Sequence, residues 1–318
     1  MDCASAAALL QGWDDILVLC HASPDGDTLG SAAALVRGLR ALGKRARYAC
    51  GDKPDEKFAY LFAGLGPEEF APAHIMSVDV ADASLLGGIQ GEYGGRVELA
   101  IDHHGSHRHF ARESWVDPSA AACCELVFLL LKEMGVAIGQ AIASCLYTGI
   151  STDTGCFRYT NVAPRTHRIA AQLLELGANA GDINRAMFES KSRAQVEAER
   201  LVMEGLEFHC GGKCALVRVP WSVYQHSGAR EGELEGIASL PRQIQGVLVG
   251  VTLKEKEDGT VKASIRSNPP ASAGAICEGF GGGGHKYAGG GSFPGLTLEE
   301  AAQKLLPACR EHLASVAG

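Results

Sequence analysis

The chain has 318 residues, which is long for a single hydrophobic core, so we expect two domains. It is 46% hydrophobic and 21% charged, as in ordinary soluble globular proteins. Its formal net charge of −8, from 29 basic and 37 acidic residues, argues against the broad basic surface of a protein that binds long duplex nucleic acid. An anionic substrate would have to be small, or be bound by local cations.

Short apolar runs alternate with segments of helical period through the first half of the chain. The expected strands are residues 15–21, 47–50, 74–79 and 97–102. The expected helices are residues 28–42, 120–134 and 137–148. Strands that are apolar throughout and separated by helices are typical of a parallel sheet covered by helices on both faces. We therefore predict an α/β domain over residues 1–190.

The second half of the chain has a different pattern. Residues 191–208 carry charged residues with apolar residues at helical spacing, which we interpret as a helical linker. Three strands and a closing amphipathic helix are expected after it, at residues 214–219, 246–253, 259–266 and 298–316. These elements predict a smaller α+β domain over residues 209–318.

The termini and the cysteines carry no sign of export. No stretch approaches the roughly 20 apolar residues that cross a bilayer, and the N-terminus lacks the basic segment of a signal peptide. The eleven cysteines are scattered and odd in number, which favours reduced thiols that act as small apolar residues. We therefore expect a cytoplasmic protein without a membrane partner.

Side chains that bind metals follow the predicted strands of the first domain. They are, in chain order, His21, Asp25, Asp27, Asp79, Asp102, His103, His104 and, after an apolar helix, Asp153. Ligands gather beyond the carboxyl ends of strands in an open parallel sheet, so we expect these side chains to lie together. Taken singly, most have another interpretation, since Asp25 or Asp27 can cap the helix that follows. Asp79 is harder to explain in that way, because burying a lone carboxylate is costly.

The chemistry of this set suits hard divalent cations. Carboxylates and imidazoles without thiolates favour manganese or magnesium over zinc or iron. Two such ions about 3.5–4 Å apart can clamp a phosphate and deprotonate a bridging water. The sequence therefore predicts a two-metal phosphoesterase. His107 and His109, just past this run, are expected to be surface residues rather than ligands.

These motifs resemble those of the DHH phosphoesterase superfamily, and within it the short oligoribonuclease and 3′-phosphoadenosine-5′-phosphate (pAp) phosphatase type. In the first domain the resemblance rests on the residues described above and on the segment 152–159, TDTGCFRY. In the second it rests on the segments 264–267 and 281–290, which resemble the DHH-associated C-terminal domain. The motifs occur in the family's order over nearly the whole chain, and no ligand is missing.

The resemblance implies two Mn²⁺ ions per subunit, with Mg²⁺ or another divalent metal as an alternative. The implied ligands are His21, Asp25 and Asp79 for the first ion, and Asp27, Asp79, His103 and Asp153 for the second. Asp102 would orient an imidazole from behind. His104 would face the substrate, where it would stabilise the phosphoryl group or protonate the leaving oxygen.

The second domain is implied to hold the substrate's terminal phosphate. The implied contacts are Arg266, Ser267, Gly283, Gly284 and His285, with Arg158 from the first domain. Consecutive glycines let backbone N–H groups approach a phosphate, although such a run alone is more often a flexible loop. Arginine suits a phosphate because it can bind two of its oxygens at once. For Phe157 and Tyr159, which flank Arg158, contact with a base or ribose and packing in the core remain equal alternatives.

We therefore predict hydrolysis of the 3′-O–P bond of short 5′-phosphorylated oligoribonucleotides, releasing 5′-mononucleotides, and of pAp, releasing AMP and phosphate. A phosphodiesterase for pApA or cyclic di-AMP is the main alternative. A RecJ-like exonuclease for short single strands and a phosphate or polyphosphate hydrolase are further ones. A non-catalytic nucleotide sensor is disfavoured, because every ligand position is filled. Long duplex nucleic acid is not expected as a partner, and the oligomeric state, including a homodimer, stays open.

Overall fold

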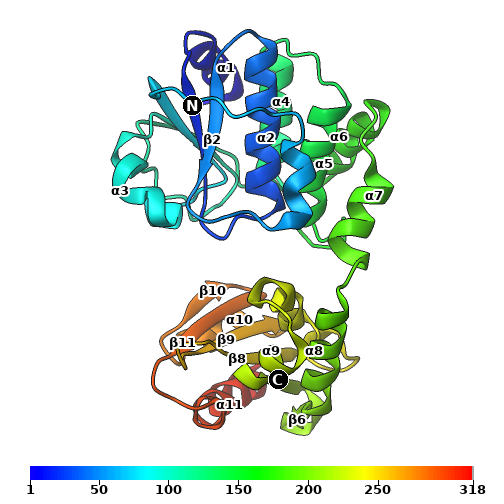
Figure 1. Cartoon of the computed structure of the whole chain (residues 1–318). Helices are drawn as coiled ribbons and strands as arrows, with labels where there is room; N and C mark the ends of the chain where they lie inside the picture. Colours follow the sequence, from blue (N-terminus) through cyan, green and yellow to red (C-terminus); the bar gives the residue numbers. More distant parts are fainter. Residues whose placement is uncertain (317–318) are drawn as a thin grey trace. The chain divides into compact units, whose positions relative to one another are not determined.

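A five-stranded parallel sheet organises the first part of the chain (Figure 1). Its strands are β1 (Ile16–Cys20), β2 (Ala46–Cys50), β3 (His74–Val78), β4 (Leu99–Asp102) and β5 (Glu113–Val116). They lie in the order β2-β1-β3-β4-β5, and every neighbouring pair is parallel. β1 is buried along its whole length, as its uninterrupted apolar sequence predicts.

The computed structural model describes residues 1–316, apart from the side chain of His285. It divides into two units, Met1–Ser190 and Lys191–Gly318, and each has buried clusters of its own.

Helices cover both faces of the parallel sheet, but unequally. The helices of the first unit are α1 (Cys3–Gln11), α2 (Gly26–Ala41), α3 (Gln90–Tyr93), α4 (Cys123–Glu133), α5 (Gln140–Asp153), α6 (Pro164–Glu175) and α7 (Ala180–Asn184). α2 and α4 pack on one face, with α1 beside α4, and α5 packs against both α2 and α4. On the other face, Leu86 and Tyr93, from a segment of short helical turns, pack with Leu17 of β1. The predicted α/β class is confirmed, with only short helices on the second face.

The close packing of α2 against α5 depends on glycine. A Cβ on Gly30 of α2 would lie 2.5 Å from the backbone oxygen of Cys145. A Cβ on Gly149 of α5 would lie 2.3 Å from Sγ of Cys124 and 2.6 Å from Oδ1 of Asp27. The two helices therefore approach so closely that glycine leaves just enough space for the Asp27 carboxylate between them.

The second unit is built on a mixed six-stranded sheet in the order β10-β11-β9-β8-β7-β6. Its strands are β6 (Glu207–His209), β7 (Cys214–Val219), β8 (Val249–Glu255), β9 (Val261–Ser267), β10 (Gly283–His285) and β11 (Ala288–Phe293). Its helices are α8 (Arg193–Glu204), α9 (Trp221–Ser227), α10 (Ala273–Glu278) and α11 (Leu298–Ser315). β7 and β8 are parallel and the other pairs are antiparallel. This matches the predicted α+β domain.

The structure gives more detail than the sequence for two segments of the second unit, the linker helix and the glycine-rich stretch. The helix expected in the linker is α8, whose Ala198 and Val202 are buried with Val217 and Val219 of β7. The glycine-rich stretch is not a free loop, because Gly283–His285 pairs with residues 288–290 of β11 in an antiparallel hairpin.

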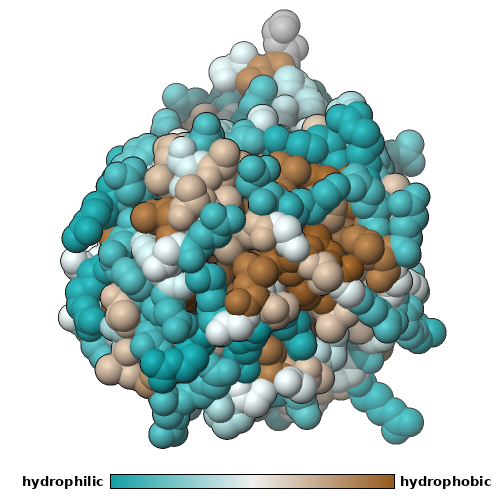
Figure 2. Space-filling view, turned by 90° about the horizontal axis from the view of Figure 1, so that it is seen from above, coloured by the Kyte–Doolittle hydropathy of each residue, from teal (hydrophilic) through white to brown (hydrophobic). Residues whose placement is uncertain are grey.

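The surface is mixed in character. Seen from above the view of Figure 1, an apolar area lies within a largely hydrophilic surround (Figure 2). Exposed large apolar side chains belong to several elements, among them Leu176 after α6, Val196 of α8 and Phe208 of β6. Within residues 1–316, no helix is long and apolar enough to cross a membrane.

Candidate metal centre

The predicted ligands lie at the carboxyl edge of the parallel sheet. His21 follows β1, Asp79 follows β3, and Asp102 ends β4. The strand order reverses between β1 and β3, and the crevice at such a switch point is where open α/β sheets bind ligands. The fold therefore brings these strand ends to one place, as the sequence predicted.

Asp25 and Asp27 follow β1 on the first turn of α2 but have different surroundings. Asp25 caps the helix, since its Oδ1 accepts from the backbone N–H of Asp27 (2.9 Å) and of Thr28 (3.1 Å). The same oxygen lies 3.6 Å from Nε2 of His21, so capping does not remove it from the site. Asp27 is fully buried, and its two oxygens accept from the backbone N–H of Cys123 (2.5 Å) and Cys124 (2.9 Å) at the start of α4.

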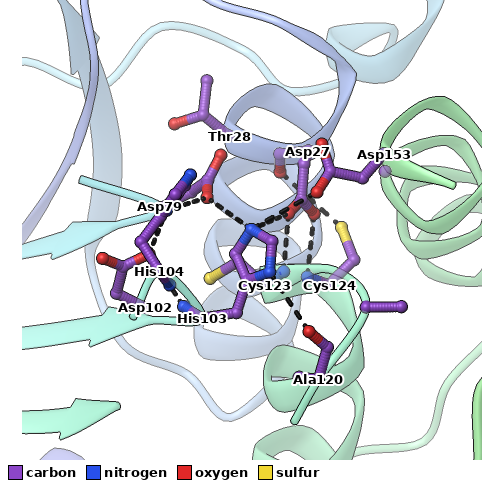
Figure 3. Close-up of polar contacts among 12 residues, drawn as sticks. Asp27, Thr28, Asp79, Asp102, His103, His104, Ala120, Cys123, Cys124 and Asp153 are labelled. Carbon is purple, nitrogen blue, oxygen red and sulfur yellow. Dashed lines mark hydrogen bonds and ion pairs between the residues drawn. The ribbon is translucent and has the colours of Figure 1, made fainter. Parts of the chain in front are cut away.

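Asp79 lies beside His103 and His104 in the cluster (Figure 3). It is 3% exposed, and its φ of +60° is in the left-handed region that aspartate tolerates better than most residues. Its Oδ2 lies 3.6 Å from Nε2 of His21 and its Oδ1 lies 3.4 Å from Nε2 of His103. One carboxylate thus faces both imidazoles.

His103 is oriented from behind. Its Nδ1 donates to the backbone oxygen of Ala120 at 3.2 Å, which directs Nε2 toward the carboxylates (Figure 3). Nε2 lies 3.8 Å from Oδ2 of Asp27 and 3.3 Å from Oδ2 of Asp153, the last residue of α5. Among the described residues, neither this Nε2 nor Oδ1 of Asp79 has a hydrogen-bond partner, although both atoms are buried.

Three groups of possible ligands result, and within each the ligand atoms lie within 4.8 Å of one another. Two of them share no residue and are each compact enough for one cation: His21, Asp25 and Asp79, and Asp27, His103 and Asp153. The third group, Asp79, Asp102, His103 and His104, shares Asp79 with the first and His103 with the second. Buried polar atoms without partners are costly, and a cation between them would satisfy them. The residues therefore fit a pair of divalent cations with Asp79 between them.

The protonation of the cluster reflects an excess of negative charge. Burial opposes the protonation of His21, but its contacts with Asp25 and Asp79 outweigh burial and raise its pKa to about 11. The pKa of His103 rises to about 10 in the same way, against burial and mainly through Asp79. Burial and then the charge of Asp79 raise the pKa of Asp27 to about 7. Such raised pKa values are expected where several carboxylates share a site that bound cations would neutralise.

Asp102 orients His104. It is fully buried, and its Oδ1 accepts from the backbone N–H of His103 (2.7 Å) and from Nδ1 of His104 (2.8 Å). That bond raises the pKa of His104, whose side chain is 37% exposed. With Nδ1 engaged, Nε2 is the remaining ring nitrogen of His104. The sequence did not indicate which imidazole Asp102 would orient.

The segment after Asp153 has an unusual backbone. Gly155, Cys156 and Phe157 all have positive φ, from +55° to +62°. Phe157 packs on the core of the first unit and stacks on His167, with ring centroids 5.4 Å apart, so it is a packing residue. Tyr159 is 46% exposed, and Nε of Arg158 donates to the backbone oxygen of Gly155 at 2.5 Å.

The predicted phosphate contacts of the second unit gather near the β10–β11 hairpin. Arg266 of β9 pairs with Ala288 of β11. Ser267 is 2% exposed, and its hydroxyl accepts from the backbone N–H of Ala273, the first residue of α10, at 3.0 Å. A Cβ on Gly283 would meet none of the described atoms within 4 Å, whereas one on Gly284 would lie 2.3 Å from Cα of Gly289. The side chain of His285 lies outside the described residues.

Some residues of the site were not found from the sequence. Cys123 and Cys124 were expected to be small apolar residues, yet their backbone N–H groups hold Asp27. The possible signal was their place at the start of a predicted helix, where N–H groups lack partners. The prediction of a surface position was wrong for His107, which is 8% exposed, because its loop folds back beneath the Asp102-His103-His104 run.

The chain matches two family models. Residues 15–150 match the model described as "DHH family, N-terminal domain", and residues 210–314 match "DHHA1 domain". The bifunctional oligoribonuclease and PAP phosphatase NrnA of Thermus thermophilus is 36% identical over 307 residues, which cover 94% of this chain and 90% of the relative. The protein of the same name from Bacillus subtilis is 25% identical, covering 94% of this chain and 96% of its own.

Solved structures share the fold. An exopolyphosphatase-related protein from Bacteroides fragilis superposes with a TM-score of 0.91 at 24% identity, over 99% of this chain and 97% of the other. RecJ from Thermus thermophilus, solved with Mn²⁺, superposes with a TM-score of 0.58 at 19% identity, over 97% of this chain and 55% of its own.

Proposed function

Since the chain belongs to the DHH phosphoesterase superfamily, we propose that it hydrolyses the 3′-O–P bond of small 5′-phosphorylated nucleotides with the help of two manganese ions. Its substrates would be short oligoribonucleotides, which release 5′-mononucleotides, and pAp, which releases AMP and phosphate. The observation that carries the proposal is the position of Asp79 between His21 and His103 at the switch point of the sheet. The names of the relatives at 36% and 25% identity support both substrates.

The donor set supports the choice of metal. His21, Asp25 and Asp79 would hold one ion, and Asp27, His103 and Asp153 would hold the other with Asp79 shared. Carboxylate and imidazole donors without thiolates favour manganese or magnesium over zinc or iron. Bound cations would supply activation of a water nucleophile and neutralisation of charge on the phosphate.

The protein's own groups have complementary tasks. Asp102 keeps Nδ1 of His104 engaged, so that Nε2 can stabilise the reacting phosphoryl group or protonate the leaving 3′ oxygen. Arg266, Ser267 and the backbone of the β10–β11 hairpin would hold the terminal phosphate. Recognition of a terminal phosphate would favour 5′-phosphorylated nucleotides, and the net charge of −8 disfavours long nucleic acid.

Replacement of Asp79 by asparagine tests the metal assignment. Asparagine keeps the side-chain size and tolerates the positive φ, so D79N removes the charge without straining the backbone. We expect pAp hydrolysis in Mn²⁺ to fall by more than about 100-fold, beyond the usual effect of changing an outer partner of a metal ligand. E113Q, at an exposed position of β5, is the matched control. Near-normal turnover by D79N would refute the two-ion site.

A substrate panel with R266A tests the phosphate site. The panel compares pAp, pApA, RNA dimers to pentamers, longer RNA, single-stranded DNA and cyclic di-AMP. Loss of Arg266 should raise KM for the 5′-phosphorylated substrates by about 10-fold or more, as expected for a lost charge-assisted hydrogen bond. K262A, an exposed residue of the same strand, should leave KM unchanged. If cyclic di-AMP or pApA is preferred to pAp and RNA, the phosphodiesterase alternative is correct instead.

A further inference from the structure

His107 is buried behind the Asp102-His103-His104 run. Its side chain is 1% exposed, and its ring packs against His109 and Phe110, with centroids 5.0 Å and 5.6 Å away. Two hydrogen bonds fix the backbone around His107: the N–H of His107 donates to the oxygen of His104 (3.1 Å), and the N–H of Arg108 donates to the oxygen of Ala81 (2.8 Å). The ring therefore has a defined place under the catalytic edge.

The hydrogen bonds of His107 determine its tautomer. Nδ1 accepts from the backbone N–H of His109 at 2.9 Å, so in the neutral ring the proton is on Nε2. Burial lowers the pKa of His107, which keeps the ring neutral. Nε2 is buried and, within the described part of the chain, has no hydrogen-bond partner.

The group that faces this nitrogen is the second oxygen of Asp102. Oδ2 lies 4.0 Å from Nε2 of His107 and is likewise buried without a hydrogen-bond partner among the described residues. The first oxygen, Oδ1, already accepts from the backbone and ring N–H of His104. Asp102 thus stands between a buried donor that lacks an acceptor and the imidazole that it orients.

We propose that His107 is a positioning residue that donates Nε2–H to Oδ2 of Asp102 and so fixes the carboxylate that orients His104. The inference rests on the proposed function and deepens it. The distance must shorten by about 1 Å to reach hydrogen-bond length, a change typical of catalytic hydrogen bonds that tighten when substrate binds. With Asp102 fixed at both oxygens, His104 keeps one orientation toward the phosphoryl group.

Two substitutions test the roles of the two ring nitrogens of His107 separately. Glutamine can place its amide nitrogen near the position of Nε2, so H107Q keeps a donor for Asp102. Asparagine can accept from His109 N in place of Nδ1 but is too short to reach Asp102, so H107N keeps the loop and loses the donor. For the Mn²⁺-loaded full chain acting on pAp, H107N should lower kcat by about 10-fold, with KM and Mn²⁺ affinity changed less than about twofold. H107Q should recover most of kcat, and H109N is the control within the same loop.

A double-mutant cycle tests whether the effect passes through His104. In the H104A background, H107N should lower kcat no further, because the imidazole that it positions is gone. A full further loss in that background, or an H107N enzyme with normal kcat, would overturn the inference. Wild-type turnover of pAp tests the proposed function separately, so the two failures are distinguishable.

A measurement on the unmodified protein covers the case in which H107N does not fold. The ¹⁵N spectrum of its imidazoles should show His107 as the neutral form protonated at Nε2. A signal from the form protonated at Nδ1 would overturn the proposal without any variant.

Discussion

Asp25 and Asp27 show how far the role of a residue depends on what surrounds it. Only one residue separates the two carboxylates in the sequence, yet Asp25 is half exposed and caps α2, whereas Asp27 is fully buried. The N-terminus of α4 compensates for that burial, because its free N–H groups and the positive end of its dipole face both oxygens of Asp27. The first turn of α4 thus stabilises the buried carboxylate of Asp27, which is one of the proposed metal ligands.

At the scale of single residues, we predict that His21 and His103 release protons when Mn²⁺ binds. The pKa of His21 is raised to about 11 and that of His103 to about 10, so before a cation binds both imidazoles are protonated at pH 7. Ligation requires the neutral ring, so Mn²⁺ must displace protons. Titration calorimetry at pH 7, in two buffers of different ionisation enthalpy, should show net proton release, and affinity should rise with pH. Equal heats in the two buffers would contradict these pKa values.

The raised pKa values of His21 and His103 also predict how the stability of the folded protein depends on pH. A raised histidine pKa stabilises the folded protein fully below the ordinary value of 6.5, and this contribution is lost as the pH rises through 10 to 11. Without added metal, the first unit should therefore lose stability at a lower alkaline pH than it does with Mn²⁺ bound.

The residues that meet could be predicted from the sequence, but their individual contacts could not. Strand ends of one parallel sheet share an edge, which is why His21, Asp79 and His103 could be grouped in advance. The burial of His107 depends on how residues 104–110 fold back on Ala81, and no periodicity in the sequence reports such a loop. The choice of His104 as the partner of Asp102 is likewise set by the turn after β4.

At the scale of elements, the contact of α2 with α5 links packing to the site. Gly149 lies in the interior of α5, where alanine would ordinarily be favoured by about 1 kcal/mol. Its Cβ would however meet Sγ of Cys124 at 2.3 Å and Oδ1 of Asp27 at 2.6 Å. The clash therefore involves both the core and a proposed metal ligand.

G149A should lower the free energy of unfolding by about 2 kcal/mol, within the usual range for overpacking a core. Urea denaturation measures the loss, and a parallel Mn²⁺ titration should show weaker binding because Asp27 is displaced. G181A is the matched control, since Gly181 is a helical glycine of α7 whose Cβ would meet no described atom within 4 Å. If G149A were as stable as G181A, the close approach of α2 and α5 would be refuted.

The sequence analysis missed several elements, among them the helices α1 and α6 and three strands that are defined by pairing rather than by periodicity, β5, β10 and β11. β5 is four residues long and only partly buried, so its sequence alone does not distinguish it from a loop. β10 and β11 consist largely of glycine, which has low strand propensity, and they exist because β11 pairs with β9. Long apolar strands and amphipathic helices such as β1 and α11 were predicted closely, because burial leaves a pattern in their sequences.

At the scale of the whole molecule, the two units have separate cores. The clusters around the parallel sheet contain only residues of Met1–Ser190, and those around the mixed sheet only residues of Lys191–Gly318. All the proposed metal ligands belong to the first unit. A ligand that binds only the folded state stabilises the part of the protein that contains its site.

Removal of metal should therefore act on one unit alone. At a free Mn²⁺ concentration 100 times its Kd, binding stabilises the first unit by about 2.7 kcal/mol, which shifts its Tm by about 5 °C or more. Scanning calorimetry of the full chain should show two transitions, of which EDTA lowers one and leaves the other in place. The D79N protein should already show the lowered transition, and EDTA should not move it further. A single transition that EDTA shifts as a whole would mean that the two units unfold together, and a transition unmoved by EDTA in the wild-type protein would contradict the metal site itself.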